Sequence, residues 1–353
     1  MDTNALDTQI KILTEKINSS NLPKELFEKV NTMISLLAAT SRQSDSFVNF
    51  EAISNYINWV CSIPFRSETK DILDISHARE VLDKNHYGLQ SVKDRILEYL
   101  SSIILILQSS SSDNIIRAPI LCLIGLVGTG KTTLAYSIAQ ALGRNFERIP
   151  FGGMGDVASL RGQSRAFADA EPGLIVKKLI HAKNKNPVIL LDELDRVTDS
   201  GRADIMGALV ELLDPEQNRA FTDHFVDYPV DLSNVLFVAT ANNTTNIATA
   251  VLDRLEIIQM PSYSDDEKKV IAKDYLFPKI LSQTGLSSSA LKISDDVWPT
   301  IIRPLGFDSG IRSLERSIEG ICRKVARIMV EGKMPQDGTI TITEQNIKEF
   351  LPK

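Results

Sequence analysis

A glycine-rich string constrains the fold of this chain more than any other feature. The string follows a continuous apolar run at residues 120–124 and precedes a stretch with helical periodicity at residues 132–142. It fits the pattern G-x-x-x-x-G-K-[ST] and consists of Gly125, Leu126, Val127, Gly128, Thr129, Gly130, Lys131 and Thr132. Glycines let backbone N–H groups surround a phosphate, and the following helix points its positive N-terminus at the anion. The string therefore predicts a P-loop between a buried strand and a helix.

The end of this string carries side chains suited to a nucleoside triphosphate. Lys131 has a positive charge that can reach the β- and γ-phosphates, and the hydroxyl of Thr132 can hold Mg²⁺. Thr133 follows in the same helical turn, and we predict that it also borders the nucleotide. The alternative interpretation is a glycine-rich turn with a surface lysine, which the flanking strand and helix signals disfavour.

An acidic pair closes a second apolar run. The run at residues 188–191 ends at Asp192, and Glu193 follows. An aspartate at the end of a buried strand can lie on the far side of Mg²⁺, and the glutamate beside it can polarise an attacking water. The alternative for such a pair is a helix N-cap. Residues 184–187 break the Asn-Lys-x-Asp pattern that reads guanine, so we predict ATP with Mg²⁺ rather than GTP.

Apolar runs and helical periodicity divide the chain into three parts. Continuous apolar runs at 120–124, 188–191 and 235–239 alternate with helices, which is typical of a parallel sheet covered on both faces. Apolar spacing predicts helices up to about residue 66, and helices dominate again beyond Pro261. We therefore predict an α/β fold with a helical N-terminal segment, a P-loop α/β domain and a mainly helical lid, at residues 1–66, 67–260 and 261–353.

The lid segment contains the clearest amphipathic helix of the chain. Aliphatic residues recur at spacings of three and four from Ile311 to Ile328, and Asp308 or Ser309 is placed to cap the helix. Residues 339–343 alternate like a short strand. These patterns predict a lid built around one long helix.

Three further polar residues are candidates for the same site. Asn242 closes the third apolar run, where it could orient a water near the γ-phosphate, although strand-end asparagines also form turns. Arg254 follows in Leu-Asp-Arg-Leu, and Arg312 stands in the first turn of the lid helix. An arginine at a helix N-terminus opposes the macrodipole, which indicates another task. Surface ion pairing remains the alternative for both arginines.

Composition limits the other function classes. The net charge of −6 disfavours a general attraction to nucleic acid or to an anionic membrane. The three cysteines have no metal-binding spacing, which indicates buried thiols or thiols without a chemical role, in a reducing compartment. Residues 1–16 do not resemble a signal peptide, and the longest apolar run is too short for a bilayer, which needs about 20 residues. We therefore expect a cytoplasmic protein.

Several longer strings resemble the ATPase part of Lon proteases. The first of the most specific strings begins with His-Tyr-Gly-Leu and covers residues 86–99. The others are Leu-Leu-Asp-Pro-Glu-Gln-Asn at 212–218, Phe-Val-Ala-Thr-Ala-Asn at 237–242 and Gly-Ile-Arg-Ser-Leu-Glu-Arg at 310–316. Residues 54–59 are similar to the last helix of the Lon N-terminal arm. The resemblance runs from about Asn21 to the C-terminus and implies an AAA+ fold.

This resemblance assigns roles to the residues already singled out. Lys131 and Thr132 correspond to Walker A, and Asp192 and Glu193 to Walker B. Asn242 corresponds to the residue called sensor 1. The resemblance thus implies the same ATP and Mg²⁺ site that the motifs predict.

Other roles rest on the resemblance alone. Arg254 matches the arginine finger, which works in the neighbouring subunit's site, so a hexameric ring is implied. Arg312 matches sensor 2 on the lid. His86, Tyr87 and Gly88 lie where the family borders the adenine.

One segment departs from the family. Residues 161–173 correspond to the pore loop that grips the substrate with an aromatic–aliphatic pair. Phe167 keeps the aromatic residue, but Ala168 and Glu171 replace larger apolar residues, so the grip on a polypeptide is expected to be altered. The alternative for Phe167 is packing in a core. Residues 126–127 replace the usual Pro-Pro, where the contacts are made by backbone, so nucleotide binding should survive.

Together these features predict an ATP-hydrolysing AAA+ module that drives unfolding and translocation of polypeptides. Expected partners are further copies of the chain, unfolded or damaged polypeptides and a separate protease, but neither nucleic acid nor a membrane. The sequence has no counterpart of the Lon substrate-recruiting domain or of the Ser–Lys protease domain, so we expect no peptidase activity. Two alternatives stay open: a nucleotide-gated regulatory or binding module, and a degenerate, monomeric Lon-like ATPase.

Overall fold

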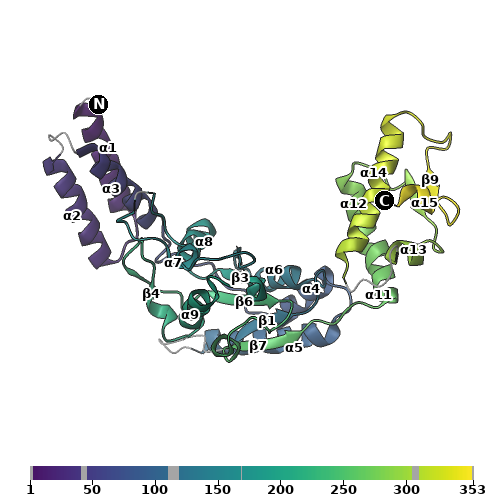
Figure 1. Ribbon diagram of the computed structural model, residues 1–353, viewed down its shortest axis with the longest axis horizontal. Helices are drawn as coiled ribbons and strands as arrows, with labels where there is room; N and C mark the ends of the chain where they lie inside the picture. Colours follow the sequence, from purple (N-terminus) through teal and green to yellow (C-terminus); the bar gives the residue numbers. More distant parts are fainter. Residues whose placement is uncertain (1–2, 41–45, 110–118, 168, 304–309, 352–353) are drawn as a thin grey trace.

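The computed structural model describes residues 3–40, 46–109, 119–167, 169–303 and 310–351. Figure 1 shows an arc in which N-terminal helices form one end, an α/β domain the middle and a C-terminal lid the other end. The predicted α/β fold, with a helical N-terminal segment and a mainly helical lid, is confirmed. The division points at residues 66 and 260 stay predictions. No helix in the described ranges is both long and apolar enough to cross a membrane.

The α/β domain is built on a five-stranded parallel sheet with the order β2-β3-β6-β1-β7. The central strands β3, β6 and β1 coincide with the three predicted apolar runs, because strands covered on both faces need apolar side chains at nearly every position. The edge strands β2 and β7 carry charged residues and were not predicted. The strands are β1 (Ile120–Ile124), β2 (Phe146–Pro150), β3 (Val188–Asp192), β6 (Leu236–Ala241) and β7 (Leu255–Gln259).

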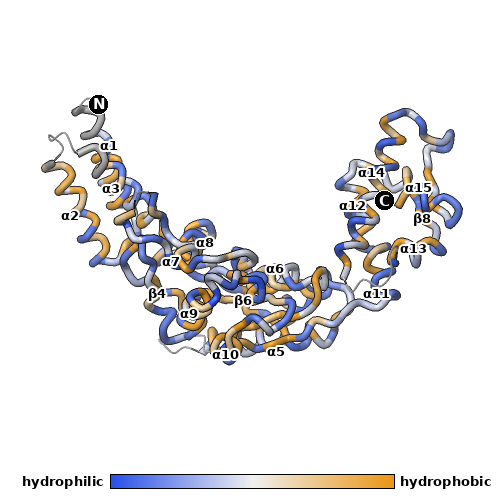
Figure 2. The backbone as a smooth tube through the Cα atoms, viewed as in Figure 1, coloured by the Kyte–Doolittle hydropathy of each residue, from blue (hydrophilic) through white to orange (hydrophobic). Residues whose placement is uncertain are grey.

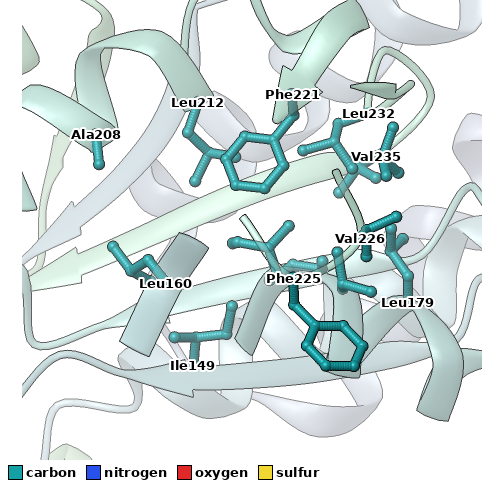
Figure 3. Packing of buried hydrophobic residues seen from close by; sticks show 14 of the residues in the cluster. Ile149, Leu160, Leu179, Ala208, Leu212, Phe221, Phe225, Val226, Leu232 and Val235 are labelled. Carbon is teal, nitrogen blue, oxygen red and sulfur yellow. The ribbon is translucent and has the colours of Figure 1, made fainter. Parts of the chain in front are cut away.

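Helices cover both faces of this sheet. Because side chains alternate along each strand, neighbouring residues of β3 enter different cores: Leu190 packs with α4, α5 and α6, and Leu191 with α8 and α9. Figure 3 shows the second of these cores, where Ile149 of β2 lies among residues from helices and loops. The helices are α4 (Ile75–Asn85), α5 (Gln90–Gln108), α6 (Lys131–Leu142), α8 (Leu174–Ala182) and α9 (Arg202–Leu212).

Short elements complete the domain. They are α7 (Ala158–Arg161), α10 (Thr249–Leu252), the 3₁₀ turns η1 (Leu194–Arg196) and η2 (Asn218–Ala220), and the antiparallel strands β4 (Phe221–Thr222) and β5 (Pro229–Val230).

The N-terminal arm is a group of three helices, α1 (Thr3–Ser19), α2 (Lys24–Thr40) and α3 (Ser46–Val60). Hydrophobic residues recur among hydrophilic ones along α2, as an amphipathic helix requires (Figure 2). Leu26 and Val30 of α2 and Ile57 of α3 are fully buried. These side chains belong to the same core as one face of the sheet, so the arm and the α/β domain share one hydrophobic interior.

The lid has a core of its own around α14 (Arg312–Val330). The predicted long helix is present, but its N-cap is Ile311 and makes no side-chain cap bond, so the predicted cap is wrong. Asp308 and Ser309 themselves lie outside the described residues. The other lid elements are α11 (Asp265–Val270), the π-helical turn η3 (Ile271–Leu276), α12 (Phe277–Gln283), β8 (Leu291–Ile293), α13 (Trp298–Ile302), β9 (Ile340–Ile342) and α15 (Ile347–Phe350). Strand β9 matches the predicted alternation and pairs with β8 in parallel.

Candidate nucleotide-binding site

A cavity of about 610 Å³ lies where the α/β domain meets the lid. Its wall includes the P-loop and the start of α6, the carboxyl ends of β3 and β6, the residues after α4, and residues of η3 and α14. In open α/β sheets ligands bind at the carboxyl ends of the strands, and this cavity is in that position. Its volume falls within the range of small-molecule sites, which is about 300–1,000 Å³.

The P-loop turns tightly at two glycines. Gly128 has a φ of 84° and Gly130 a φ of 92°, a conformation that only glycine adopts readily. Helix α6 begins directly afterwards at Lys131, so its free N–H groups face the cavity. Of the nine residues predicted to bind phosphate, six line the cavity: Val127, Gly128, Gly130, Lys131, Thr132 and Thr133. Gly125, Leu126 and Thr129 do not line it and instead shape the loop, for example through a bond from the Thr129 hydroxyl to the Leu126 carbonyl.

Lys131 lies at the centre of the polar wall. Its Nζ donates to the carbonyls of Gly125 and Leu126, at 2.6 and 3.0 Å, and to Oδ1 of Asn242, at 3.2 Å. Burial lowers the pKa of this ammonium group, and the nearby carboxylates, Asp192 first among them, oppose that shift. The structure therefore holds a partly desolvated cation beside the loop, as phosphate binding requires.

The acidic pair lines the same cavity as Lys131. Asp192 ends β3 and is almost fully buried, and its Oδ1 accepts from the Thr240 hydroxyl. The same Thr240 oxygen accepts the N–H of Glu193, at 3.0 Å. Glu193 has a left-handed φ of 60°, which is uncommon for a residue with a side chain and occurs at functional sites as well as at turns and helix ends. Glu193 occupies the N-cap position of the 3₁₀ turn that follows, but its side chain makes no cap bond there.

Asp195 positions Asn242 and was not predicted. This buried carboxylate accepts the backbone N–H of Asn242, at 3.0 Å, and its side-chain amide, at 3.3 Å. The amide oxygen of Asn242 is thereby turned toward Lys131. In the sequence, Asp195 is visible only as a further acidic residue two places after Glu193. An aspartate in such a turn has many other possible roles.

Arg148 is a second residue that the sequence did not reveal. It stands in the edge strand β2, whose register places it beside Leu190 of β3. Its Nε donates to Oδ2 of Asp192, at 2.7 Å, its Nη2 lies 2.5 Å from the same oxygen in an ion pair, and it lines the cavity. Only the pairing of β2 with β3 brings the arginine to the aspartate.

The other end of the cavity is aromatic. Tyr87, after α4, and Tyr275, of the π-helical turn, have ring centroids 6.3 Å apart, and π-helical turns are frequent at functional sites. His86 is buried, and its Nε2 lies 2.9 Å from the Ser137 hydroxyl. Burial, with a smaller contribution from Lys93, lowers the pKa of His86 to about 4.

Not every residue predicted at this end borders the cavity. His86 and Tyr87 line it, but Gly88 does not. Gly88 instead has a φ of 64°, and a Cβ there would lie 2.9 Å from Oε1 of Glu267. Gly88 therefore allows the turn between α4 and α5, which passes close to Glu267 of the lid.

The lid reaches the P-loop at the start of α14. The N–H of Ile311 donates to the carbonyl of Gly128, at 3.0 Å, and Arg312 lines the cavity. The predicted residues Lys131, Asp192, Glu193, Asn242 and Arg312 thus converge on one cavity from both sides of the domain boundary.

Comparisons with known proteins agree with this arrangement. Residues 121–263 match the ATPase family associated with various cellular activities (AAA), and residues 282–338 match the Lon protease AAA+ ATPase lid domain. Over 345 residues the chain is 43% identical to the Lon protease of Lawsonia intracellularis. It is 41% identical to the Lon protease of Bacillus thuringiensis over 348 residues and to Lon protease 1 of Bacillus subtilis over 345. Each alignment covers 98% of this chain. The chain matches the AAA+ ATPase module of the Lon protease family.

What is shared with these Lon proteases is the AAA+ ATPase module. The chain spans between 40% and 43% of the length of the three relatives. An AAA domain followed by a Lon lid identifies an ATPase of the Lon type and implies nucleotide binding. The cavity where these two domains meet contains the P-loop, the acidic pair and Arg312 in its wall.

Two residues expected to act in Lon lie away from this cavity. Arg254 is not among the lining residues, and its Nη2 pairs with Oδ2 of Asp214, at 3.1 Å, so the ion-pair alternative describes its state in the single chain. Phe167 is 68% exposed, which excludes the alternative that it packs in a core. Ala168, its predicted partner, lies outside the described residues.

Proposed function

We propose that this chain binds ATP with Mg²⁺ in the cavity between the AAA domain and the lid, and hydrolyses it. The observation that carries the proposal is the convergence of Lys131, Asp192, Glu193 and Asn242 on one wall beside the P-loop. In this assignment the phosphates lie against the N-terminus of α6, and the base lies toward Tyr87 and the lid.

The residues present fit Mg²⁺. This ion prefers oxygen ligands and is held in related NTPases by a P-loop hydroxyl and a strand-end aspartate, here Thr132 and Asp192. A cation, the guanidinium of Arg148, already contacts Oδ2 of Asp192, so this oxygen is accessible to positive charge. When bound, Mg²⁺ would help to neutralise the charge that develops on the phosphate oxygens.

In hydrolysis, Glu193 would polarise the water that attacks the γ-phosphate, and Asn242 would orient that water. Lys131 would stabilise charge on the transferring phosphoryl group. Arg312 would approach the phosphates from the lid. A bound nucleotide would therefore contact both the α/β domain and the lid.

The most direct test compares two substitutions. Glu193→Gln should keep nucleotide affinity and abolish turnover, because it removes the carboxylate that polarises water. Lys131→Ala should lose nucleotide affinity, because it removes the cation that faces the phosphates. Binding is measured with a fluorescent nucleotide and turnover by phosphate release, with Arg323→Ala, an exposed ion-paired lid arginine, as the control. Turnover of Glu193→Gln at the wild-type rate would disprove the assignment of Glu193.

We further propose that the chain works as a cytoplasmic ring, by analogy with its family a hexamer. Arg254 would leave Asp214 to complete the site of the neighbouring subunit. Phe167, exposed on its loop, would contact a translocated polypeptide. Arg254→Ala should then reduce turnover by roughly 10³–10⁵-fold while nucleotide binding stays near normal.

Mixing experiments separate this ring from a monomer. Arg254→Ala and Lys131→Ala are each inactive in the ring, but a mixture should regain part of the activity, because a Lys131 intact in one subunit can meet an Arg254 intact in the next. A specific activity that is independent of concentration, with no recovery on mixing, would contradict the ring and favour a monomeric nucleotide-gated module.

A further inference from the structure

The carboxylate of Asp192 is fully engaged by protein groups. Its Oδ1 accepts from the hydroxyl of Thr240, and its Oδ2 accepts from Nε of Arg148, at 2.7 Å, and forms an ion pair with Nη2 at 2.5 Å. We propose that Arg148 is an internal counter-ion that occupies the metal-binding oxygen of Asp192 and must release it before Mg²⁺ and nucleotide can bind. This inference rests on the proposed function, since it requires Asp192 to be a Mg²⁺ ligand.

Burial explains why Asp192 needs a counter-ion. Its side chain is 5% exposed, and a buried carboxylate without a partner is strongly unfavourable. Thr240 satisfies one oxygen with a neutral donor, but it supplies no charge. The guanidinium of Arg148 supplies Oδ2 with both a positive charge and a charge-assisted hydrogen bond, which Nε donates.

The two partners of this ion pair differ in what separation costs them. Arg148 is 51% exposed, so its guanidinium can move toward solvent without becoming a buried, unpaired charge. Asp192 cannot move toward solvent, because it ends a central strand between β2 and β6. Release therefore depends on another cation that takes over Oδ2.

Mg²⁺ and the guanidinium compete for Oδ2. Two cations in contact with one carboxylate oxygen repel each other, so we treat their binding as mutually exclusive. A released Arg148 remains on the cavity wall, because β2 is fixed in register beside β3. A guanidinium is well suited to phosphate oxygens, so a nucleotide gives Arg148 a new partner when Mg²⁺ takes the old one. Arg148 is thus a positioning residue that makes metal binding depend on nucleotide.

The experiment measures metal and nucleotide binding directly rather than turnover. Mn²⁺ serves as the metal, detected by its electron paramagnetic resonance signal, and a fluorescent ADP as the nucleotide, titrated with Mg²⁺. In wild type, Mn²⁺ should bind only when nucleotide is present. In Arg148→Ala, Mn²⁺ should bind without nucleotide, and the Mg²⁺ concentration that half-saturates its effect on ADP binding should fall about tenfold or more.

Two further variants keep the test sharp. Arg196→Ala removes an arginine of similar exposure, 49%, that pairs with Glu193 instead of Asp192, and it should leave the Mg²⁺ requirement nearly unchanged. Arg148→Lys keeps the charge but loses the Nε donor and the planar guanidinium, so its Mg²⁺ requirement should fall between those of wild type and Arg148→Ala. If Arg148→Ala does not fold, Arg148→Lys decides the question, and a requirement equal to that of wild type overturns the inference.

Asp192→Asn distinguishes a failure of the proposed metal site from a failure of the proposed role of Arg148. It should abolish the effect of Mg²⁺ on ADP binding. If the effect survives in Asp192→Asn, then Asp192 is not the metal ligand, and both the proposed site and the role of Arg148 are wrong. If the effect is lost in Asp192→Asn but Arg148→Ala needs as much Mg²⁺ as wild type, only the counter-ion role of Arg148 is wrong.

Discussion

The N-terminal arm and the lid flank the same α/β domain, but they are joined to it in different ways. The arm has no core separate from the domain in the described residues, since its buried side chains lie in one cluster with a face of the sheet. The lid has its own cluster around α14, whereas its first residues, such as Ile271 of η3, pack into the core of the α/β domain. A shared core makes two segments fold together, whereas separate cores allow two bodies to move relative to each other.

Polar contacts follow the same division. On the arm side, Tyr56 donates to the buried carbonyl of Val226, and the segment after the arm is held by a buried two-pronged ion pair of Asp71 with Arg144. None of these four residues lines the nucleotide cavity. On the lid side, the N–H of Ile311 bonds to the P-loop itself, so the lid is attached at the place where phosphate would bind. From this comparison we predict that the arm stabilises the domain and that the lid responds to a bound nucleotide.

The largest expected effect comes from a matched pair of core substitutions. Ile57 of α3 and Ile318 of α14 are both fully buried, and replacing either by alanine should cost about 2–5 kcal/mol. Ile57→Ala should lower the unfolding temperature of the arm and α/β domain together, because they share a core. Ile318→Ala should shift only a separate, lid transition. Calorimetry distinguishes these outcomes, and one common transition that shifts equally in both variants would remove the distinction between arm and lid.

The second prediction concerns how the unfolding free energy of the α/β domain depends on pH through His86. The pKa of folded His86 is about 4 because of burial, and its ordinary value is 6.5. Between these values the unfolded chain takes up a proton that the folded chain does not, so the unfolding free energy falls as the pH falls from about 6.5 to about 4. From about pH 7.5 to about pH 5 the loss should be about 2 kcal/mol.

Denaturant titrations at the two pH values measure this loss. His86→Gln should remove it, whereas His77→Gln, at a half-buried position earlier in α4, should keep it. An equal acid sensitivity in wild type and His86→Gln would show that another group is responsible.

The smallest expected effect is at the junction of the arm with the domain. Tyr56→Phe keeps the buried ring but removes the donor to the Val226 carbonyl, which should cost about 1–2 kcal/mol. Thr32→Val removes a hydroxyl that bonds only within α2 and serves as the control. The loss should appear in the transition of the arm and domain, and an effect confined to the lid would contradict the shared core.

The sequence predicted the parts of this molecule that depend on local pattern. The P-loop and strands β1, β3 and β6 were found because buried parallel strands leave continuous apolar runs. Strand β2 was missed because Glu147 and Arg148 interrupt its apolar pattern, and with it the contact between Arg148 and Asp192. That contact depends on strand order and register, which no local pattern encodes.

Local sequence patterns also failed to predict other contacts of the site and the first residue of the lid helix. Asp195 is indistinguishable from a surface aspartate until β6 places Asn242 beside it. The helix cap predicted at Asp308 or Ser309 was wrong because the amphipathic pattern fixes a helix face more securely than its first residue. The role of Arg254 stays a prediction, since it concerns a second copy of the chain.

Distances between spin labels test the central claim, that the lid responds to nucleotide while the arm does not. Labels at Lys11→Cys and Asp199→Cys report on the arm and the domain, and labels at Asp199→Cys and Lys333→Cys on the domain and the lid, all at exposed positions. The accessible Cys61 is replaced by serine, and labelled chain is diluted with unlabelled chain so that only distances within one chain contribute. A non-hydrolysable ATP analogue with Mg²⁺ should change the domain–lid distance distribution and leave the arm–domain distribution unchanged. An unchanged domain–lid distribution at saturating nucleotide, or an equal change in both pairs, would contradict the account.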